Sequence, residues 1–366
     1  MSGLRITNCH VHTFTSRHVP SLFPHPLAIP FVRIPGLVRA LAFLARAIGQ
    51  HPWGDWLDRL YQMQIETNET RQAKILDRLI PQYPAATRFV VLPMALQSLA
   101  PGRIADPLPR QHDELAAIAR DPAYAAHVIP FATIYPDAPG AADEVRRCID
   151  ELGFRGLKLY PRLGYPPDHP VLMEEVYPLM AERNLPVISH CSRGGVTGRQ
   201  LTAAKAERWS SPQAFVPVLE AFPDLRVCLA HFGGEGDWRA YVEAGVNPRG
   251  GMQARQANWQ TAIRDMITGW TDPETGETQK AYGNLWTDIS YTLFHFEDFV
   301  PFLQVFLRNE TLAGRVLFGS DYYMTRQEVL SERAVCFRLR VALGEEMFAR
   351  IAQTNPEVWL GERAAA

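Results

Sequence analysis

The sequence predicts an α/β fold of the (β/α)8 TIM barrel class, with a helical segment inserted after the first strand. Short apolar runs rich in β-branched residues alternate with longer stretches of helical period from Arg88 onward. Continuous apolar strands that alternate with helices are typical of a parallel sheet covered on its outer face. The chain has 366 residues, and we expect all of them, 1–366, to form a single barrel domain.

Each predicted strand is followed by sequence of helical period. The strands are expected at 4–10, 88–94, 127–134, 154–160, 185–190, 225–231, 284–290 and 315–321. The helices are expected at 111–120, 141–152, 171–183, 212–222, 238–244, 254–268, 297–308, 326–341 and 345–354. A doubly wound open sheet is the alternative topology. No GxGxxG motif follows the first strand, so the sequence does not indicate a dinucleotide site there.

Residues 13–80 interrupt this alternation and form the predicted insertion. A proline-rich passage leads into an apolar helix at 36–48, and a more polar helical segment follows at about 53–79. Three arginines and several prolines in and before the apolar helix argue against a transmembrane span. We expect this helix to pack on its own domain or on a second subunit, so a homo-oligomer, a dimer, is the expected assembly. A lid over a site and an interfacial membrane helix are the alternatives.

Composition limits the classes of partner. The formal net charge of −2 gives no electrostatic reason to expect nucleic acid or an anionic membrane, so the expected partner is a small molecule. The five cysteines are scattered and form no CxxC motif, which favours free thiols in a reducing compartment. The first strand begins almost at Met1, which leaves no room for a signal peptide. We therefore expect a cytoplasmic location.

Two histidines end the first predicted strand, in the segment ITNCHVH at 6–12. His10 and His12 are one residue apart, and residues i and i+2 of a strand point to the same face. Imidazole suits zinc and other late first-row metals, so both rings could bind one ion. A His-x-His pair by itself is more often a solvated loop feature, and the prediction therefore depends on ligands from other strands.

Further polar residues lie at or near the C-terminal ends of later predicted strands. They are Lys158, His190, His231 and Asp321. In a closed barrel these strand ends surround one mouth, where the active site of such barrels lies. A single histidine after an apolar strand is commonly a capping or core residue. Here three strands end in histidine and one ends in aspartate, all at one rim. This combination indicates a shared metal site.

These residues carry a family resemblance. The matching segments are NCHVH, GFRGLKLYP, PVISHCS, LAHFGG, LFGSDYY and the closing QTNPEVWLG. As an ordered set they resemble the amidohydrolase superfamily, and specifically the amidohydrolase-related branch that includes the aminocarboxymuconate-semialdehyde decarboxylase-like enzymes. The resemblance covers residues 4–12 and 85–362. The insertion at 13–80 lies outside it.

The resemblance implies a metal-dependent enzyme and a role for each strand-end residue. His10, His12, His190 and Asp321 resemble the ligands of one divalent ion, with zinc expected first and manganese second. His231 resembles the residue that polarises water or the substrate oxygen, or that moves a proton. In binuclear members the histidine at this position is itself a metal ligand.

Lys158 resembles the lysine that is carboxylated and bridges two metals in binuclear members. Two alternatives remain open for it. The ammonium could pair with Asp288 or Asp321, or it could bind a substrate carboxylate. We favour a single metal.

The chemistry of these groups supports the assignment. Water bound to a zinc ion with neutral imidazole ligands can have its pKa lowered to ~7, so hydroxide is available at neutral pH. One oxygen of Asp321 can contact the metal while the other accepts the proton of the attacking water. The metal or His231 would stabilise the oxyanion. Cys9 and Cys191 flank ligand histidines, and we interpret them as packing residues.

Substrate contacts are expected just beyond the strand ends. The candidates are Tyr160, Arg162, Arg193, Asp288, Tyr291 and Tyr322, with Tyr323 and His295 further along. Arginines at a metal site suit a carboxylate-bearing substrate, and Asp288 could instead orient a ligand histidine. The favoured function is hydrolysis of an amide, lactone or similar C–N or C–O bond of a small molecule. The alternatives are non-oxidative decarboxylation of an aromatic or unsaturated acid and a catalytically silent binding protein.

Overall fold

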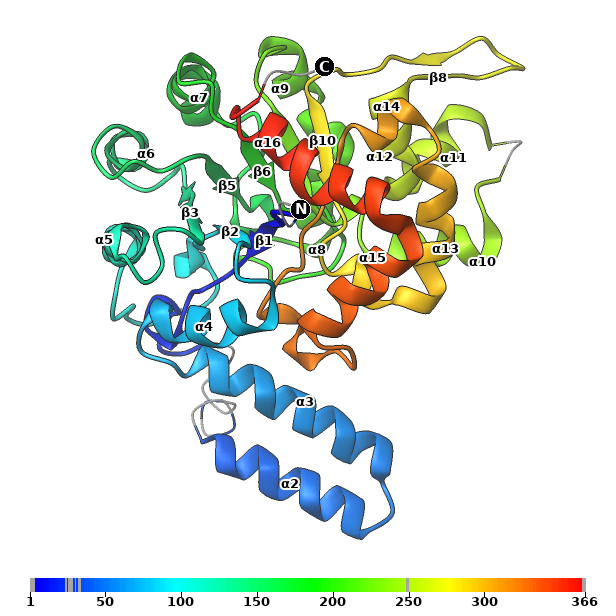
Figure 1. Cartoon of the computed structure of the whole chain (residues 1–366). Coiled ribbons are helices and arrows are strands. Elements are labelled where there is room, and N and C mark those ends of the chain that lie inside the picture. Colours follow the sequence, from blue (N-terminus) through cyan, green and yellow to red (C-terminus); the bar gives the residue numbers. More distant parts are fainter. Residues whose placement is uncertain are drawn as a thin grey trace.

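The computed structural model describes residues 4–363 except 24, 26–28, 30, 32, 33, 248 and 249. Its centre is a barrel of parallel strands, and the eight that the sequence predicts are all present in this part of the chain (Figure 1). They are β1 (Thr7–Val11), β2 (Arg88–Val91), β3 (Val128–Pro130) with β4 (Ala132–Thr133), β5 (Leu157–Leu159), β6 (Val187–Ser189), β7 (Val227–Leu229), β10 (Leu285–Asp288) and β11 (Val316–Leu317). β3 and β4 are two pieces of one barrel strand, because only Phe131 separates them. The predicted barrel is confirmed.

Hydrogen bonds connect the strands into a ring. β1 pairs with β2 and β2 with β3, while β4, β5, β6, β7, β10 and β11 pair in that order, all parallel. β1 also contacts the segment around β11, since the amide of Cys9 donates to the carbonyl of Phe318 at 2.8 Å. The amide of Asp321 donates to the carbonyl of His10 at 2.8 Å. The first and last strand ends are therefore side by side.

Helices surround the strands (Figure 1). They are α5 (Leu108–Arg120), α6 (Ala141–Asp150), α7 (Tyr177–Glu182), α8 (Ala203–Ser210), α9 (Val216–Ala221), α10 (Glu235–Ala244), α11 (Gly251–Ala257), α12 (Trp259–Thr268), α13 (Phe296–Phe306), α14 (Glu310–Ala313), α15 (Glu332–Ala349) and α16 (Asn355–Trp359). The predicted helix at 326–341 is displaced: a 3-10 turn at Met324–Gln327 precedes α15, which continues past a kink at Gly344. The sequence analysis did not predict α8 or the antiparallel pair β8 (Trp270–Thr271) and β9 (Thr278–Gln279).

The apolar side chains separate into two layers. One cluster comprises alternate strand residues, among them Val90, Ile188 and Leu317, and fills the barrel interior together with Trp359. A larger cluster, which includes Val91, packs the strands against the helices. This alternation is expected, because successive strand residues point to opposite faces. The five cysteines are free and buried, and burial raises the pKa of the Cys9 and Cys191 thiols, which fits packing residues.

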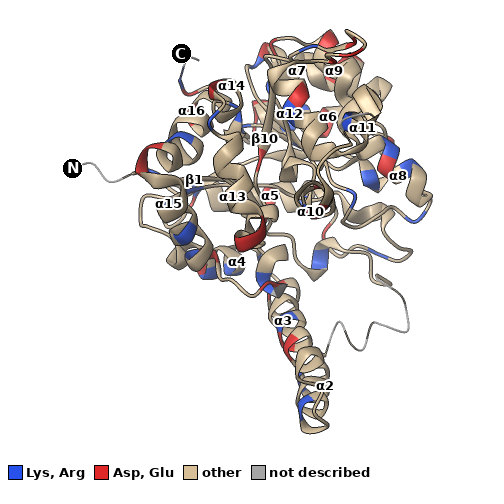
Figure 2. Cartoon of the chain, turned by 90° about the vertical axis from the view of Figure 1, so that its right-hand side faces the viewer, with Lys and Arg blue, Asp and Glu red and all other residues tan. Residues whose placement is uncertain are grey.

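The insertion contributes α2 (Pro35–Ala47), α3 (His51–Thr67) and α4 (Gln72–Leu79). α2 and α3 lie against each other and project from the barrel as an arm (Figures 1 and 2). The buried carboxylate of Glu66 connects α3 to the barrel, because it accepts hydrogen bonds from Tyr322 and Arg78, both at 2.8 Å. Within the described residues, none of the helices has the length and apolar character needed to cross a bilayer.

A buried histidine in the turn after β1 predicts acid sensitivity. Nδ1 of His18 accepts a hydrogen bond from the amide of Thr15 at 3.0 Å, and burial lowers the pKa of His18 to about 4. At a pH between about 4 and 6.5, this histidine is protonated in the unfolded chain but not in the folded one. The free energy of unfolding therefore falls as the pH falls through this range. Lowering the pH from 6.5 to 5 should reduce the free energy of unfolding by about 2 kcal/mol because of this histidine.

The variant His18→Asn tests this expectation, because the asparagine oxygen can accept the same hydrogen bond without titrating. Urea unfolding at pH 7 and pH 5 should show a smaller loss of stability for this variant than for the original protein. Equal losses in the two proteins would contradict the assignment to His18.

Candidate metal centre

The C-terminal ends of the strands open into one cavity of about 1050 Å³. His12, Lys158, His190, His231 and Asp321 line its inner end. His10 lies directly behind them and is fully buried. The fold thus brings together the strand-end residues that the sequence analysis singled out, although they are separated by as many as 311 positions in the chain.

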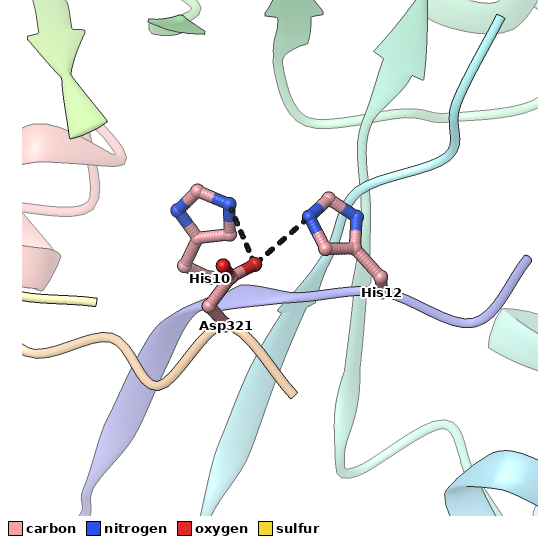
Figure 3. Close-up of side chains that lie close together, drawn as sticks. All are labelled: His10, His12 and Asp321. Carbon is pink, nitrogen blue, oxygen red and sulfur yellow. Dashed lines mark ion pairs between the residues drawn. The ribbon is translucent and has the colours of Figure 1, made fainter. Parts of the chain in front are cut away.

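His10, His12 and Asp321 form a group of possible metal ligands at this end of the cavity (Figure 3). Oδ1 of Asp321 lies 3.2 Å from Nε2 of His12 and 3.6 Å from Nε2 of His10. Asp321 has a left-handed backbone with φ 69°, a conformation that side chains rarely adopt and that occurs at functional sites. Gly319 permits the close approach of β1, since a Cβ there would lie 2.9 Å from Cβ of His10.

The hydrogen bonds made by Nδ1 of both histidines leave Nε2 of each ring, which lies near Asp321, as the acceptor. Nδ1 of His12 donates to the carbonyl of Leu92 at 2.8 Å, and Nδ1 of His10 donates to Oδ2 of Asp288 at 2.9 Å. Burial lowers the pKa of His10 to about 3, so its ring is neutral at physiological pH. Two ligand atoms bound about 2.1 Å from a tetrahedral ion lie about 3.4 Å apart. The donor set and its spacing therefore fit a divalent metal.

His190 and His231 form a second pair beside this group. Nε2 of His190 donates to the carbonyl of Gly194 at 3.0 Å, and Nδ1 of His231 lies 2.9 Å from Oγ of Ser290. The remaining ring nitrogens, Nδ1 of His190 and Nε2 of His231, are 3.1 Å apart. Burial lowers the pKa of both rings, and two neutral acceptors at this distance would be stabilised by a shared cation or proton.

Lys158 is a fully buried cation between the two groups. Its Nζ lies 3.2 Å from Nε2 of His10. Burial lowers the pKa of Lys158 to about 8, although the charges of Asp321 and Asp288 oppose the shift. A lysine with this pKa is partly neutral near pH 8, as nucleophilic attack on carbon dioxide or proton transfer would require.

Asp288 is enclosed by donors and does not reach the cavity. Its carboxylate accepts from Nδ1 of His10 and from the amides of His231 and Ser290, all at 2.9 Å. Burial alone would raise the pKa of Asp288, but the contacts with His10 and Ser290 hold it below the ordinary value. Asp288 therefore fixes the ring orientation of His10, as carboxylates behind metal-binding histidines commonly do.

Replacing Asp288 with asparagine should weaken metal binding while the fold is kept. The amide has the same size but could present its NH2 group to His10, which would favour the wrong ring tautomer. Partners of this kind typically contribute 10–100-fold in metal affinity, so a loss of about this size is expected. Competition with a chromogenic chelator measures it, and thermal unfolding monitors the fold. Unchanged affinity would remove Asp288 from this role.

Some of the predicted substrate contacts line the cavity and others do not. Tyr160, Arg193 and Tyr291 line the cavity, and Tyr160 stacks on His190 with ring centroids 4.2 Å apart. Arg193 is held by Asp237, Glu207 and the carbonyl of Ala257, so its charge is largely neutralised. Asp288, Arg162, Tyr322, Tyr323 and His295 are not among the described residues that line the cavity.

Three of these residues have other partners. Nη2 of Arg162 donates to Thr197 at 3.0 Å, the hydroxyl of Tyr322 donates to Glu66, and the hydroxyl of Tyr323 donates to the carbonyl of Phe14. Strand-end position alone did not distinguish a side chain that faces the cavity from one that faces its neighbours.

Other residues contribute to the site although the sequence pattern did not predict them. Ser290 contacts His10 and His231 at 3.1 and 2.9 Å, and its i+2 spacing from Asp288 could have indicated a shared face. Ser192 lines the cavity beyond the β6 end. Leu92 contributes a backbone carbonyl and Glu66 lies in the insertion, and no sequence signal marks either of them.

Comparison with known proteins identifies the family. The family model described as amidohydrolase matches residues 8–266, which is more than half of the chain. The chain belongs to the amidohydrolase family. The match includes the strand ends that carry His10, His12, Lys158, His190 and His231. No curated protein sequence matches this amidohydrolase.

Solved structures share the fold of this amidohydrolase at low sequence identity. A TIM-barrel protein from Bordetella bronchiseptica is 17% identical, with 98% of this chain and 99% of that chain covered and a TM-score of 0.52. A 5-carboxyvanillate decarboxylase from Novosphingobium aromaticivorans, complexed with manganese and a nitrobenzoic acid, is 15% identical, with 98% and 96% covered and a TM-score of 0.54. A probable 2-pyrone-4,6-dicarboxylic acid hydrolase from Acinetobacter baumannii is 12% identical, with 98% and 99% covered and a TM-score of 0.53.

These findings establish the class of the protein. It is an enzyme of the amidohydrolase type, and its ligand cluster could hold a metal ion.

Proposed function

We propose that this amidohydrolase hydrolyses a C–N or C–O bond of a small molecule, such as an amide or a lactone. The observation that carries the proposal is the position of Asp321. Its carboxylate faces Nε2 of His10 and of His12 at the inner end of the cavity, and only 7% of the residue is exposed. A carboxylate with one oxygen at the ligand cluster and the other free is suited to take a proton from water.

Other side chains at the inner end of the cavity supply the remaining roles in catalysis. His10, His12 and Asp321, with His190 and His231 beside them, would hold a divalent ion, which would supply polarisation of the substrate oxygen and hydroxide near pH 7. Asp321 accepts the proton of the attacking water and returns it to the leaving group. The hydrogen bonds of His231 leave its cavity-facing Nε2 as an acceptor, so the ammonium of Lys158 is the donor that would stabilise an oxyanion.

The charges of the cavity favour hydrolysis over decarboxylation. A decarboxylase must hold the carboxylate of its substrate, and Arg193 is already paired with Asp237 and Glu207. Lys158 is the observation that supports decarboxylation as a second candidate, because a buried cation at the cavity could pair with that carboxylate. Zinc is the metal we expect first and manganese the alternative.

A panel of lactones, amides, esters and aromatic acids tests the proposal on the metal-loaded enzyme. Acid release and CO2 release are followed separately with each compound. We expect acid release from at least one lactone, amide or ester and no CO2. Release of CO2 from an aromatic acid without hydrolysis of any member would replace the hydrolase proposal with the decarboxylase.

A further inference from the structure

The cavity extends far beyond the ligand cluster. From His12 and Asp321 it runs to the arm formed by α2 and α3, and its volume of about 1050 Å³ is at the upper end of the roughly 300–1,000 Å³ of ordinary ligand pockets. The arm projects from the barrel (Figure 2). The insertion therefore forms a wall of the site, which corresponds to the covering role that the sequence analysis left as an alternative.

One face of α3 lines this outer part of the cavity. Its lining residues are Trp56, Leu57, Leu60, Met63, Gln64 and Thr67. These positions recur every three or four residues, which is the spacing of one helical face. Val38 and Leu41 of α2 lie on the same side of the cavity.

The opposite wall is also apolar. It includes Phe14 and Phe23 after β1 and Met94, Leu96 and Leu99 after β2. Among the described lining residues, the charged side chains are Lys158, Arg193, Glu235 and Asp321, and none of these belongs to α2, α3 or the segments after β1 and β2. The charged side chains of the lining thus lie outside the arm, whose own contribution to the lining is largely apolar.

We propose that the substrate is an amphiphile, with its polar reacting group at Asp321 and a long apolar chain along α3. The inference rests on the proposed function, since it places the reacting group at the ligand cluster. Leu57, Leu60 and Met63 remain partly exposed in the cavity. A ligand that removed apolar surface from water at this wall would gain about fourfold in affinity for each buried methylene.

The experiment measures binding and turnover separately along one chain-length series. Calorimetry gives the affinity of butanoate, hexanoate, octanoate and decanoate for the metal-loaded protein, and the nitrophenyl esters of the same acids give kcat/KM. Affinity should rise at least 100-fold from butanoate to decanoate. The variant Leu60→Gln should reduce this rise by 10-fold or more.

Leu44→Gln is the matched control, because Leu44 belongs to the same arm, is 55% exposed and is not among the described lining residues. It should keep the chain-length dependence. Should Leu60→Gln fail to fold, Leu57→Gln replaces it at the same wall. Light scattering on each protein detects any change of assembly.

The outcomes distinguish this inference from the proposed function. Affinity that rises with chain length without ester hydrolysis supports the amphiphile site and contradicts ester hydrolysis at it, while the lactones and amides of the panel test the hydrolase separately. Hydrolysis with equal affinities and equal kcat/KM along the series supports the hydrolase and overturns the amphiphile site. Equal affinities are also expected if a second copy of the chain covers the α3 wall. If Leu60→Gln and Leu44→Gln reduced the chain-length dependence of the affinity equally, the assignment to this wall would be overturned.

Discussion

Replacing Asp321 with asparagine should reduce kcat by about 10²–10⁴-fold, the usual contribution of a positioned general base. The asparagine amide keeps the size of the side chain and one oxygen that can face His12, but it cannot accept the proton of water. Burial alone would raise the pKa of Asp321, yet the contact with His12 and the neighbouring His10 hold it below its ordinary value. The carboxylate is therefore ionised and able to accept a proton across the neutral range.

Two measurements make the result specific to the base. Metal content and kcat are determined on the same Asp321→Asn sample at saturating metal, so that loss of the ion is distinguished from loss of the proton acceptor. Asp265→Asn is the matched control, since Asp265 is equally buried but pairs with Arg255 and is not among the described lining residues. It should keep kcat. A near-normal rate in Asp321→Asn would exclude Asp321 from the mechanism.

Removal of the metal should abolish turnover and lower the midpoint of thermal unfolding. The donor atoms of His10, His12 and Asp321 lie within 4.8 Å of one another. A bound ion stabilises the folded state, because the unfolded chain does not hold this arrangement. Dialysis against a chelator should reduce activity by at least about 10³-fold, since Lewis-acid stabilisation supplies several kcal/mol. Addition of zinc or manganese should restore it, and the metal that restores more identifies the cofactor.

A pair of histidine variants tests where the ion binds. His12→Asn should lower the metal content measured by elemental analysis, because it removes a ring nitrogen that faces Asp321. His169→Asn should not, since His169 pairs with Asp137 at the surface. The candidate centre is wrong if His12→Asn retains one tightly bound equivalent of metal, or if protein kept from chelators contains no transition metal.

The sequence by itself determined the barrel and indicated which strand-end residues share its rim. Each strand is a short apolar run, and side chains at i and i+2 of a strand share a face, so His10 and His12 could be placed together from local pattern alone. The C-terminal ends of parallel strands meet at one rim of a barrel. This rule predicts from the sequence that His190, His231 and Asp321 lie at the same rim.

Tertiary structure decided which of the other polar residues face the cavity. Arg193 lines it but is neutralised by Asp237 and Glu207, whereas Tyr322 turns away to Glu66. Asp288 is enclosed by donors from β1 and from its own strand end. Apart from Ser290, these partners lie tens to hundreds of positions away, and local periodicity carries no information about them.

The role of the insertion was likewise decided only in three dimensions. Its helices could be predicted from their apolar spacing, but the packing of α2 against α3 decides which face of each helix is left for the cavity. The position of α3 on the barrel depends on contacts such as the one between Glu66 and Tyr322, which are separated by 256 positions. The physical reason is general: side-chain period fixes which residues share a face, while long-range packing fixes what that face meets.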